Sequence, residues 1–179
     1  MSGNQHPVAL LHGAAFMTSA SIGPQPLETR TSIRDAGIAL ATQARRELLI
    51  FGPHLEPDLY DQPPLLEAIR RLALERPDLP VRILVKETRD ALQQGHRLIE
   101  LARRLTSRIA IRRSGEDDRA RTDAFLVVDA RGYVHRHHAD GQRASTAAAD
   151  APEARRLRET FMQMWERSDS DREIDRLYL

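Results

Sequence analysis

The spacing of hydrophobic positions changes several times along the chain, and each change marks a predicted element. Apolar residues three or four positions apart predict helices, whereas short unbroken apolar runs that end in turn residues predict buried strands. The predicted strands are residues 48–51, 81–85, 108–112, 125–128 and 133–137. The predicted helices are one that begins at Ser32 with a capping box to Asp35, one between Pro63 and Pro77, one that ends near Leu105, and one that aligns Leu157, Phe161 and Trp165.

The order of these elements predicts the fold class. Helices and strands alternate through the first three strands, which is expected of an α/β domain with a mainly parallel sheet. The last two strands flank a turn at 129–132 and predict an antiparallel hairpin near 124–137. We therefore expect a mixed, mainly parallel sheet flanked by helices. Residues 1–30 are predicted to be a flexible N-terminal lead-in, residues 31–179 a single domain, and the small polar segment 139–152 a mobile connection.

Length, charge and composition limit the classes of function. A chain of 179 residues fits one domain, and its formal net charge of +1 gives no strong attraction to nucleic acid, which we do not expect as a partner. The absence of cysteine excludes disulfides and thiolate chemistry and suits a cytoplasmic protein. No apolar run is long enough to span a membrane, and no signal peptide is expected.

Candidate ligand-binding residues follow the predicted strands. Ligands in α/β sheets tend to lie outside the carboxyl ends of parallel strands. His54, Lys86 with the loop to His96, and Arg113 follow three such ends, and an antiparallel strand would bring Asp123 to the same edge. Cations and imidazoles in one cleft could bind a phosphate or a carboxylate. The alternative is that each is a solvated loop residue or a helix cap.

Three histidines close together near the hairpin raise the question of a metal. His135 and His137 share one face of a strand, and His138 follows. A metal site needs three or four converging ligands, and the sequence offers no partner pair at helical spacing. We therefore expect no specific metal site and no cofactor, and we interpret the cluster as an exposed strand end.

The order of elements, the strand at 125–129 (FLVVD) and the closing stretch at 161–165 (FMQMW) resemble one half of a phospholipase D-like domain. More narrowly, the chain is similar to an uncharacterised bacterial family related to that fold. This similarity rests on the stretches 59–61 (LYD), 95–98 (GHRL) and 165–168 (WERS). The resemblance covers about residues 31–179.

Enzymes of the phospholipase D superfamily carry a His-x-Lys-x4-Asp motif, in which the histidine attacks phosphorus and the lysine holds the phosphate oxygens. Placing Asp129 on the motif aspartate puts Thr122 at the histidine position and Ala124 at the lysine position. None of the seven histidines has Lys or Arg two residues after it. Asp129 also has a structural interpretation, because an aspartate that opens a turn can cap its own backbone.

Two hypotheses follow from the resemblance. The first is a non-catalytic phospholipase D-like domain that serves as a binding or accessory module for a phosphate-containing ligand or a protein partner. The alternative is a phosphodiesterase or nuclease that uses a rearranged histidine such as His96 or His54. The resemblance also implies a homodimer, because the superfamily site is assembled from two halves.

Overall fold

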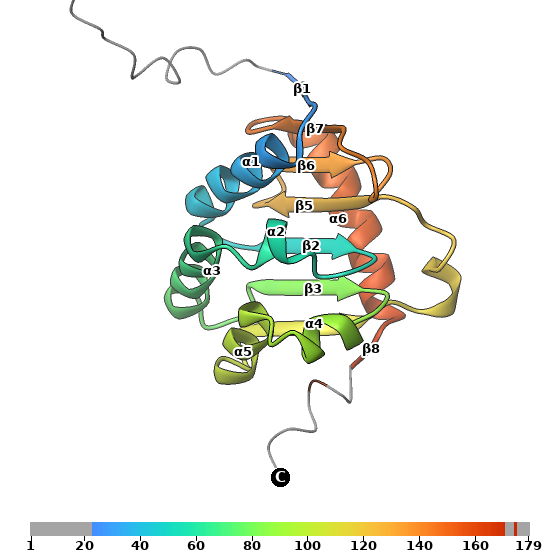
Figure 1. The fold of residues 1–179 in the computed structure, drawn as a ribbon. Helices are drawn as coiled ribbons and strands as arrows, with labels where there is room; N and C mark the ends of the chain where they lie inside the picture. Colours follow the sequence, from blue (N-terminus) through green and yellow to red (C-terminus); the bar gives the residue numbers. More distant parts are fainter. Residues whose placement is uncertain (1–22, 171–173, 175–179) are drawn as a thin grey trace, which may run out of the picture.

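The computed structural model describes residues 23–170 and residue 174, which form an eight-stranded sheet with helices on both faces (Figure 1). The strands are β1 (Gln25–Leu27), β2 (Leu48–Gly52), β3 (Val81–Val85), β4 (Ile109–Arg113), β5 (Ala124–Val128), β6 (Gly132–Arg136), β7 (Ala144–Ala147) and β8 (Asp169–Ser170). The α-helices are α1 (Arg30–Gln43), α2 (Pro57–Tyr60), α3 (Pro63–Glu75), α4 (Arg89–Gln93), α5 (Arg97–Arg104) and α6 (Ala151–Glu166). A 3-10 turn spans Glu116–Asp118.

The sheet is mixed, but it is mostly antiparallel, so the prediction of a mainly parallel sheet was wrong. The strand order is β1-β7-β6-β5-β2-β3-β4-β8, and only β2–β3 and β3–β4 pair in parallel. These two pairs come from helical crossovers, which parallel neighbours require. Every other pairing in this sheet is antiparallel. The sequence pattern did not predict the three short strands β1, β7 and β8. Their pairings are all antiparallel, and this makes the sheet mostly antiparallel.

The predicted hairpin is confirmed. Strands β5 and β6 pair with Phe125 opposite His135, and residues 129–131 turn between them. The segment 139–152, predicted to be mobile, contains strand β7 and pairs with β6. Strand β1 lies within the predicted lead-in, and the rest of that segment, residues 1–22, lies outside the described residues.

Helix boundaries differ from the prediction where local capping decides them. Helix α1 begins two residues earlier than expected, because Thr29 is the N-cap and exchanges hydrogen bonds with Ser32 in a capping box. The helix expected to end near Leu105 is α5, whereas α4 lies in the stretch before His96 that was predicted to be a loop. Gly95 separates them with a φ of +66°, a conformation that glycine adopts without steric cost.

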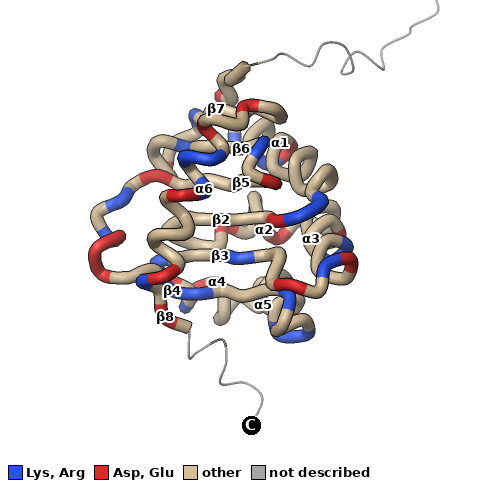
Figure 2. The backbone as a smooth tube through the Cα atoms, turned by 180° about the vertical axis from the view of Figure 1, so that it is seen from behind, with Lys and Arg blue, Asp and Glu red and all other residues tan. Residues whose placement is uncertain are grey.

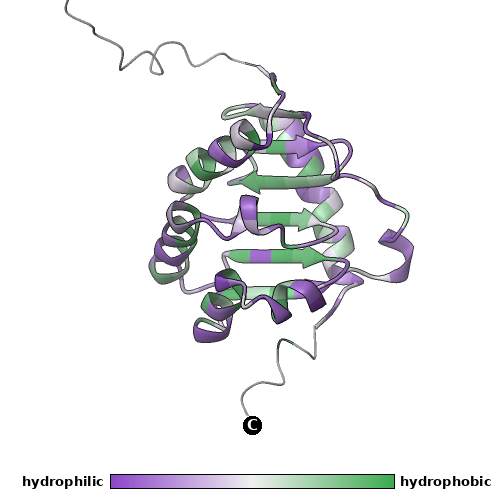
Figure 3. Cartoon of the chain, in the orientation of Figure 1, coloured by the Kyte–Doolittle hydropathy of each residue, from purple (hydrophilic) through white to green (hydrophobic). Residues whose placement is uncertain are grey.

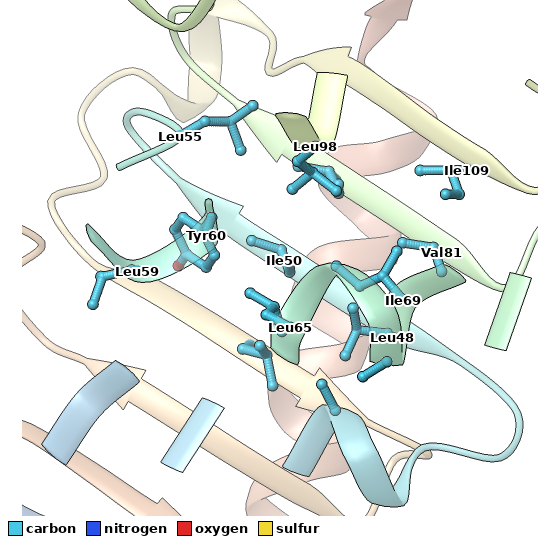
Figure 4. Packing of buried hydrophobic residues seen from close by; sticks show 14 of the residues in the cluster. Leu48, Ile50, Leu55, Leu59, Tyr60, Leu65, Ile69, Val81, Leu98 and Ile109 are labelled. Atoms are coloured by element: carbon cyan, nitrogen blue, oxygen red, sulfur yellow. The ribbon is translucent and has the colours of Figure 1, made fainter. Parts of the chain in front are cut away.

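Alternating strand residues build a core on each face of the sheet. Ile50, Ile83 and Leu126 belong to the layer under α1, α3 and α5, which Figure 4 shows from close by. Phe51 and Val127 belong to the other layer, where α6 crosses the sheet. Figure 3 shows hydrophobic strands between helices whose outward sides are hydrophilic. A strand buried on both faces requires an unbroken apolar run, which is what the sequence of β2 and β5 supplies.

The carboxyl ends of β2, β3 and β4 and the start of β5 lie side by side. We call this edge of the sheet, which is formed by strand ends, the rim. Gly52 pairs with Val85, Val85 pairs with Arg113, and Phe51 pairs with Phe125. The opposite edge holds the start of β2 and the turn between β5 and β6.

Among the described residues, no helix is long and apolar enough to cross a membrane.

Candidate functional site

Four of the five predicted ligand-binding residues lie along the rim, but they do not meet at one point. Asp123, His54, Lys86 and Arg113 adjoin β5, β2, β3 and β4, which are four successive strands of the sheet. With about 5 Å between neighbouring strands, the outer two backbones are about 15 Å apart. His54 and Arg113 are exposed. The rim is therefore a row of polar side chains and not a single convergent site.

The only lysine of the chain has a structural role. The Nζ of Lys86 donates hydrogen bonds to the carbonyl oxygens of Arg119, at 2.9 Å, and Arg121. This ammonium group thereby fixes the loop that leads into β5. Its charge is directed at the protein backbone, so it is not available to a ligand in this conformation.

His96 caps a helix. Only 1% of His96 is exposed, and its Nδ1 accepts a hydrogen bond from the backbone N–H of Leu98 at 3.2 Å, at the start of α5. Burial lowers the pKa of His96, against an opposing effect of the Asp61 carboxylate. The ring is therefore neutral at pH 7, with Nε2 buried and unpaired among the described residues. This geometry supports the helix-cap interpretation.

The structure pairs Asp123 with a histidine that sequence reasoning had placed on an exposed strand end. His135 is 5% exposed, and its Nε2 lies 3.1 Å from Oδ2 of Asp123. Arg121 also donates two hydrogen bonds to the same carboxylate, at 2.8 and 3.0 Å. Burial disfavours ionisation, but the bonds from His135 and Arg121 outweigh it and lower the pKa of Asp123 to about 2. The hairpin register could have revealed this pair, because it places 123 and 135 on one face.

The second nitrogen of His135 faces helix α6. Its Nδ1 lies 3.8 Å from Oε1 of Glu153 and has no hydrogen-bond partner among the described residues. Arg156 binds Glu153 at 2.6 Å, and the ring of His137 lies 4.3 Å from that of His135. The two carboxylates beside His135, Asp123 and Glu153, are thus each paired with an arginine. No group of three or more acidic or histidine side chains in the described part of the chain is arranged to hold a metal ion.

An ion pair lies beside Ala124, the residue expected at the lysine position of the motif. Thr122 is exposed, and Ala124 is buried opposite Arg136 of β6. Arg136 is 2% exposed and forms a two-pronged contact with Glu56, at 3.1 and 2.5 Å. Arg30 binds the same carboxylate at 2.9 Å. The arginine opposite Ala124 is therefore already neutralised by the protein itself.

Asp129 lies at the edge opposite the rim and ties two segments together. Its carboxylate accepts backbone hydrogen bonds from Arg45, Arg46 and Glu47, at 2.9, 2.7 and 3.0 Å. The prediction that it caps its own turn therefore differs from the structure, in which it caps the segment before β2. Asp129 therefore has a structural role, and it lies at the other end of β5 from Thr122.

The chain matches the family described as "Domain of unknown function (DUF7931)" over residues 29–177. It belongs to this family. No curated protein matches the sequence.

Solved structures similar to this DUF7931 chain share its fold at low identity. Nuc from Salmonella typhimurium, described as a phospholipase D family member, is 12% identical with a TM-score of 0.59, covering 83% of this chain and 97% of Nuc. NucT from Helicobacter pylori is 11% identical with a TM-score of 0.55, covering 83% and 99%. TrmBL2, described as an archaeal chromatin protein with a novel mode of DNA binding, is 12% identical with a TM-score of 0.60. That match covers 86% of this chain but only 56% of TrmBL2. The likeness confirms the phospholipase D-like fold.

The short stretches that suggested the narrower resemblance hold the DUF7931 chain together. Asp61 accepts a hydrogen bond from Nε of Arg97 at 2.6 Å, which joins the end of α2 to the start of α5. The guanidinium carbon of Arg112 lies over the ring of Trp165, 4.3 Å from the ring centroid. These contacts give the stretches a role in packing and ion pairing.

Proposed function

We propose that this chain is a non-catalytic phospholipase D-like domain that acts as a binding or accessory module. The observation that carries the proposal is the ion pair between Arg136 and Glu56 beside Ala124. The superfamily reaction needs a nucleophilic histidine and a cation that is free to hold phosphate oxygens. Here Thr122 and Ala124 take the motif positions, and the nearby guanidinium is buried and paired.

Recruiting Arg136 for phosphate would require breaking this pair. Separating one partner of a buried ion pair costs about 3–5 kcal/mol, because the other charge is left uncompensated. Glu56 also binds Arg30, so its displacement would disturb two arginines together. This energetic barrier supports binding or accessory work over phosphodiester chemistry at the motif positions.

The exposed rim is the surface on which we expect the partner, whether a phosphate-containing ligand or a protein, to bind. His54 and Arg113 are exposed there, and so is Thr122. A similar structure, TrmBL2, is described by its DNA binding. The fold therefore occurs in a protein that is described as a binder.

The alternative is a phosphodiesterase or nuclease, acting as a homodimer through a rearranged histidine. One observation favours it: Asp123 orients His135 at 3.1 Å, which is the arrangement of a general base and its positioning carboxylate. The similar Nuc is described as a phospholipase D family member. His135 is a better candidate for this role than His96, which is a buried helix cap, or His54, which lacks an oriented carboxylate among the described residues.

A turnover assay separates the two functions. The full chain is incubated with bis(p-nitrophenyl) phosphate at pH 5 to 8, alone and with a divalent cation, and nitrophenol release is followed. We expect no rate above the blank. A rate that His135→Gln abolishes, but that the matched variant His138→Gln at an exposed histidine leaves intact, would establish the enzyme and overturn the proposal.

A further inference from the structure

A hollow of about 570 Å³ lies at the sheet edge opposite the rim. Residues from α1, α3 and the turn between β5 and β6 line it, together with the segments that precede β2 and follow β7. Its volume is within the range of small-molecule sites. Because it lies at the other edge of the sheet, it is independent of the function proposed above.

The hollow contains positive charge that the protein does not neutralise. Arg45 and Arg131 line it, both are exposed, and neither forms an ion pair with an acidic group in the described parts of the chain. Arg71 pairs with Glu75 at 2.8 Å, and the Asp129 carboxylate, which also lines the hollow, accepts three backbone N–H groups, so three arginines face two carboxylates there. Figure 2 shows the basic segment before β2 at this edge. Two guanidinium groups therefore remain available to an anion.

Both arginines extend from rigid backbone. The N–H of Arg45 donates to Asp129 at 2.9 Å, and its carbonyl oxygen accepts from Nε of Arg76 at 2.7 Å. Arg131 follows a turn in which Asp129 and Ala130 both have positive φ, at 54° and 51°, and its N–H donates to Val128 at 3.0 Å. Strained non-glycine residues of this kind are enriched at functional sites. Fixed backbone also reduces the entropy lost when a ligand binds.

We propose that this hollow binds a phosphate-bearing small molecule through Arg45 and Arg131. A guanidinium presents parallel N–H donors that match two oxygens of a phosphate, and it keeps its charge at every physiological pH. Leu40 and Val128 also line the hollow and are placed to contact a less polar part of such a ligand.

Isothermal titration of the full chain with inorganic pyrophosphate at low salt tests the proposal. We expect saturable binding that weakens at least about tenfold in the double variant Arg45→Gln, Arg131→Gln, because each fork supplies charge-assisted hydrogen bonds. The matched control is Arg104→Gln, Arg155→Gln, which removes the same charge from two exposed arginines on α5 and α6. The control should bind within about twofold of the wild type. Absence of binding to the wild type, or an equal loss in both double variants, would overturn the proposal.

Backbone NMR locates the site independently of affinity. Pyrophosphate should shift the amide signals of residues 44–47 and 131–132 and leave those of the rim unchanged. Shifts confined to the rim would contradict the assignment. Circular dichroism melts of both double variants show whether folding is intact, so that a lost site is distinguished from a lost fold.

Discussion

Asp123 is an acid that stays ionised although it is largely covered by protein. Hydrogen bonds from His135 and Arg121 overcome its burial and lower its pKa to about 2, from an ordinary value of 3.8. A carboxyl whose pKa is lower in the folded chain stabilises the fold above its unfolded pKa. That contribution is lost as the pH falls from about 4 to about 2.

We predict that the free energy of unfolding falls less steeply at acid pH in Asp123→Asn than in the wild type. The wild type should lose about 1–2 kcal/mol more free energy of unfolding between pH 5 and pH 2.5 than the variant, after allowance for partial solvent screening. Urea titrations at several pH values, followed by circular dichroism, measure this difference. The exposed Asp140 provides the control, because Asp140→Asn should keep the wild-type slope. Equal slopes for wild type and Asp123→Asn would show that the pairing with His135 and Arg121 adds nothing.

Single residues were the hardest part of the candidate site to predict. The sequence identified Lys86 and His96 as polar residues near strand ends, but their partners are backbone groups that only the folded chain brings close. The pairing of Asp123 with His135 was accessible from the hairpin register. The contact of Glu56 with Arg136 was not, because 80 positions separate the two residues.

At the scale of elements, the turn between β5 and β6 has an unusual sequence. Hairpin turns with positive φ at two successive positions favour Asn-Gly or Asp-Gly there, because glycine adopts this conformation without a steric cost. This chain has Asp129 followed by Ala130, with φ values of 54° and 51°. The alanine is therefore strained.

We predict that Ala130→Gly stabilises the protein by about 0.5–1 kcal/mol, because relief of the left-handed conformation exceeds the entropy that glycine adds to the unfolded chain. Thermal and urea unfolding measure the change. Ala149→Gly, at an exposed bend without positive φ, should instead destabilise slightly. If both substitutions lowered stability equally, the turn would not be a source of strain.

Elements with a clear periodic pattern were predicted, and elements held by pairing alone were not. Burial leaves a signal in the sequence as a pattern of apolar residues. This signal is present in the apolar runs of β2, β3 and β5 and in the aligned Leu157, Phe161 and Trp165 of α6. Strands β1 and β7 have the sequences QPL and ASTA, with little apolar content. They are strands because a neighbour offers free backbone groups at the sheet edge.

At the scale of the whole molecule, the described surface offers little to an apolar interface. Leu74 is the only large hydrophobic residue in the described part that is exposed, at 52%. Permanent homodimers usually bury large apolar areas. A homodimer formed through this surface would therefore be polar and dependent on concentration, and the dimer implied by the resemblance stays a prediction.

The two core layers share one set of strands, and this predicts a single cooperative unfolding transition. Strand β2 contributes Ile50 to the layer under α1 and α3 and Phe51 to the layer under α6, so neither layer can be lost without the strand. Trp165, the only tryptophan, reports on α6 by fluorescence, whereas far-ultraviolet circular dichroism reports mainly on the other helices. We expect Ile50→Ala to cost about 3 kcal/mol and to shift both urea midpoints together, although the residue is not in the layer of Trp165. Leu74→Ala, at the exposed leucine, should leave both midpoints nearly unchanged. A fluorescence midpoint that stayed at the wild-type value in Ile50→Ala would mean that the layers unfold separately, and the sheet would then not couple them.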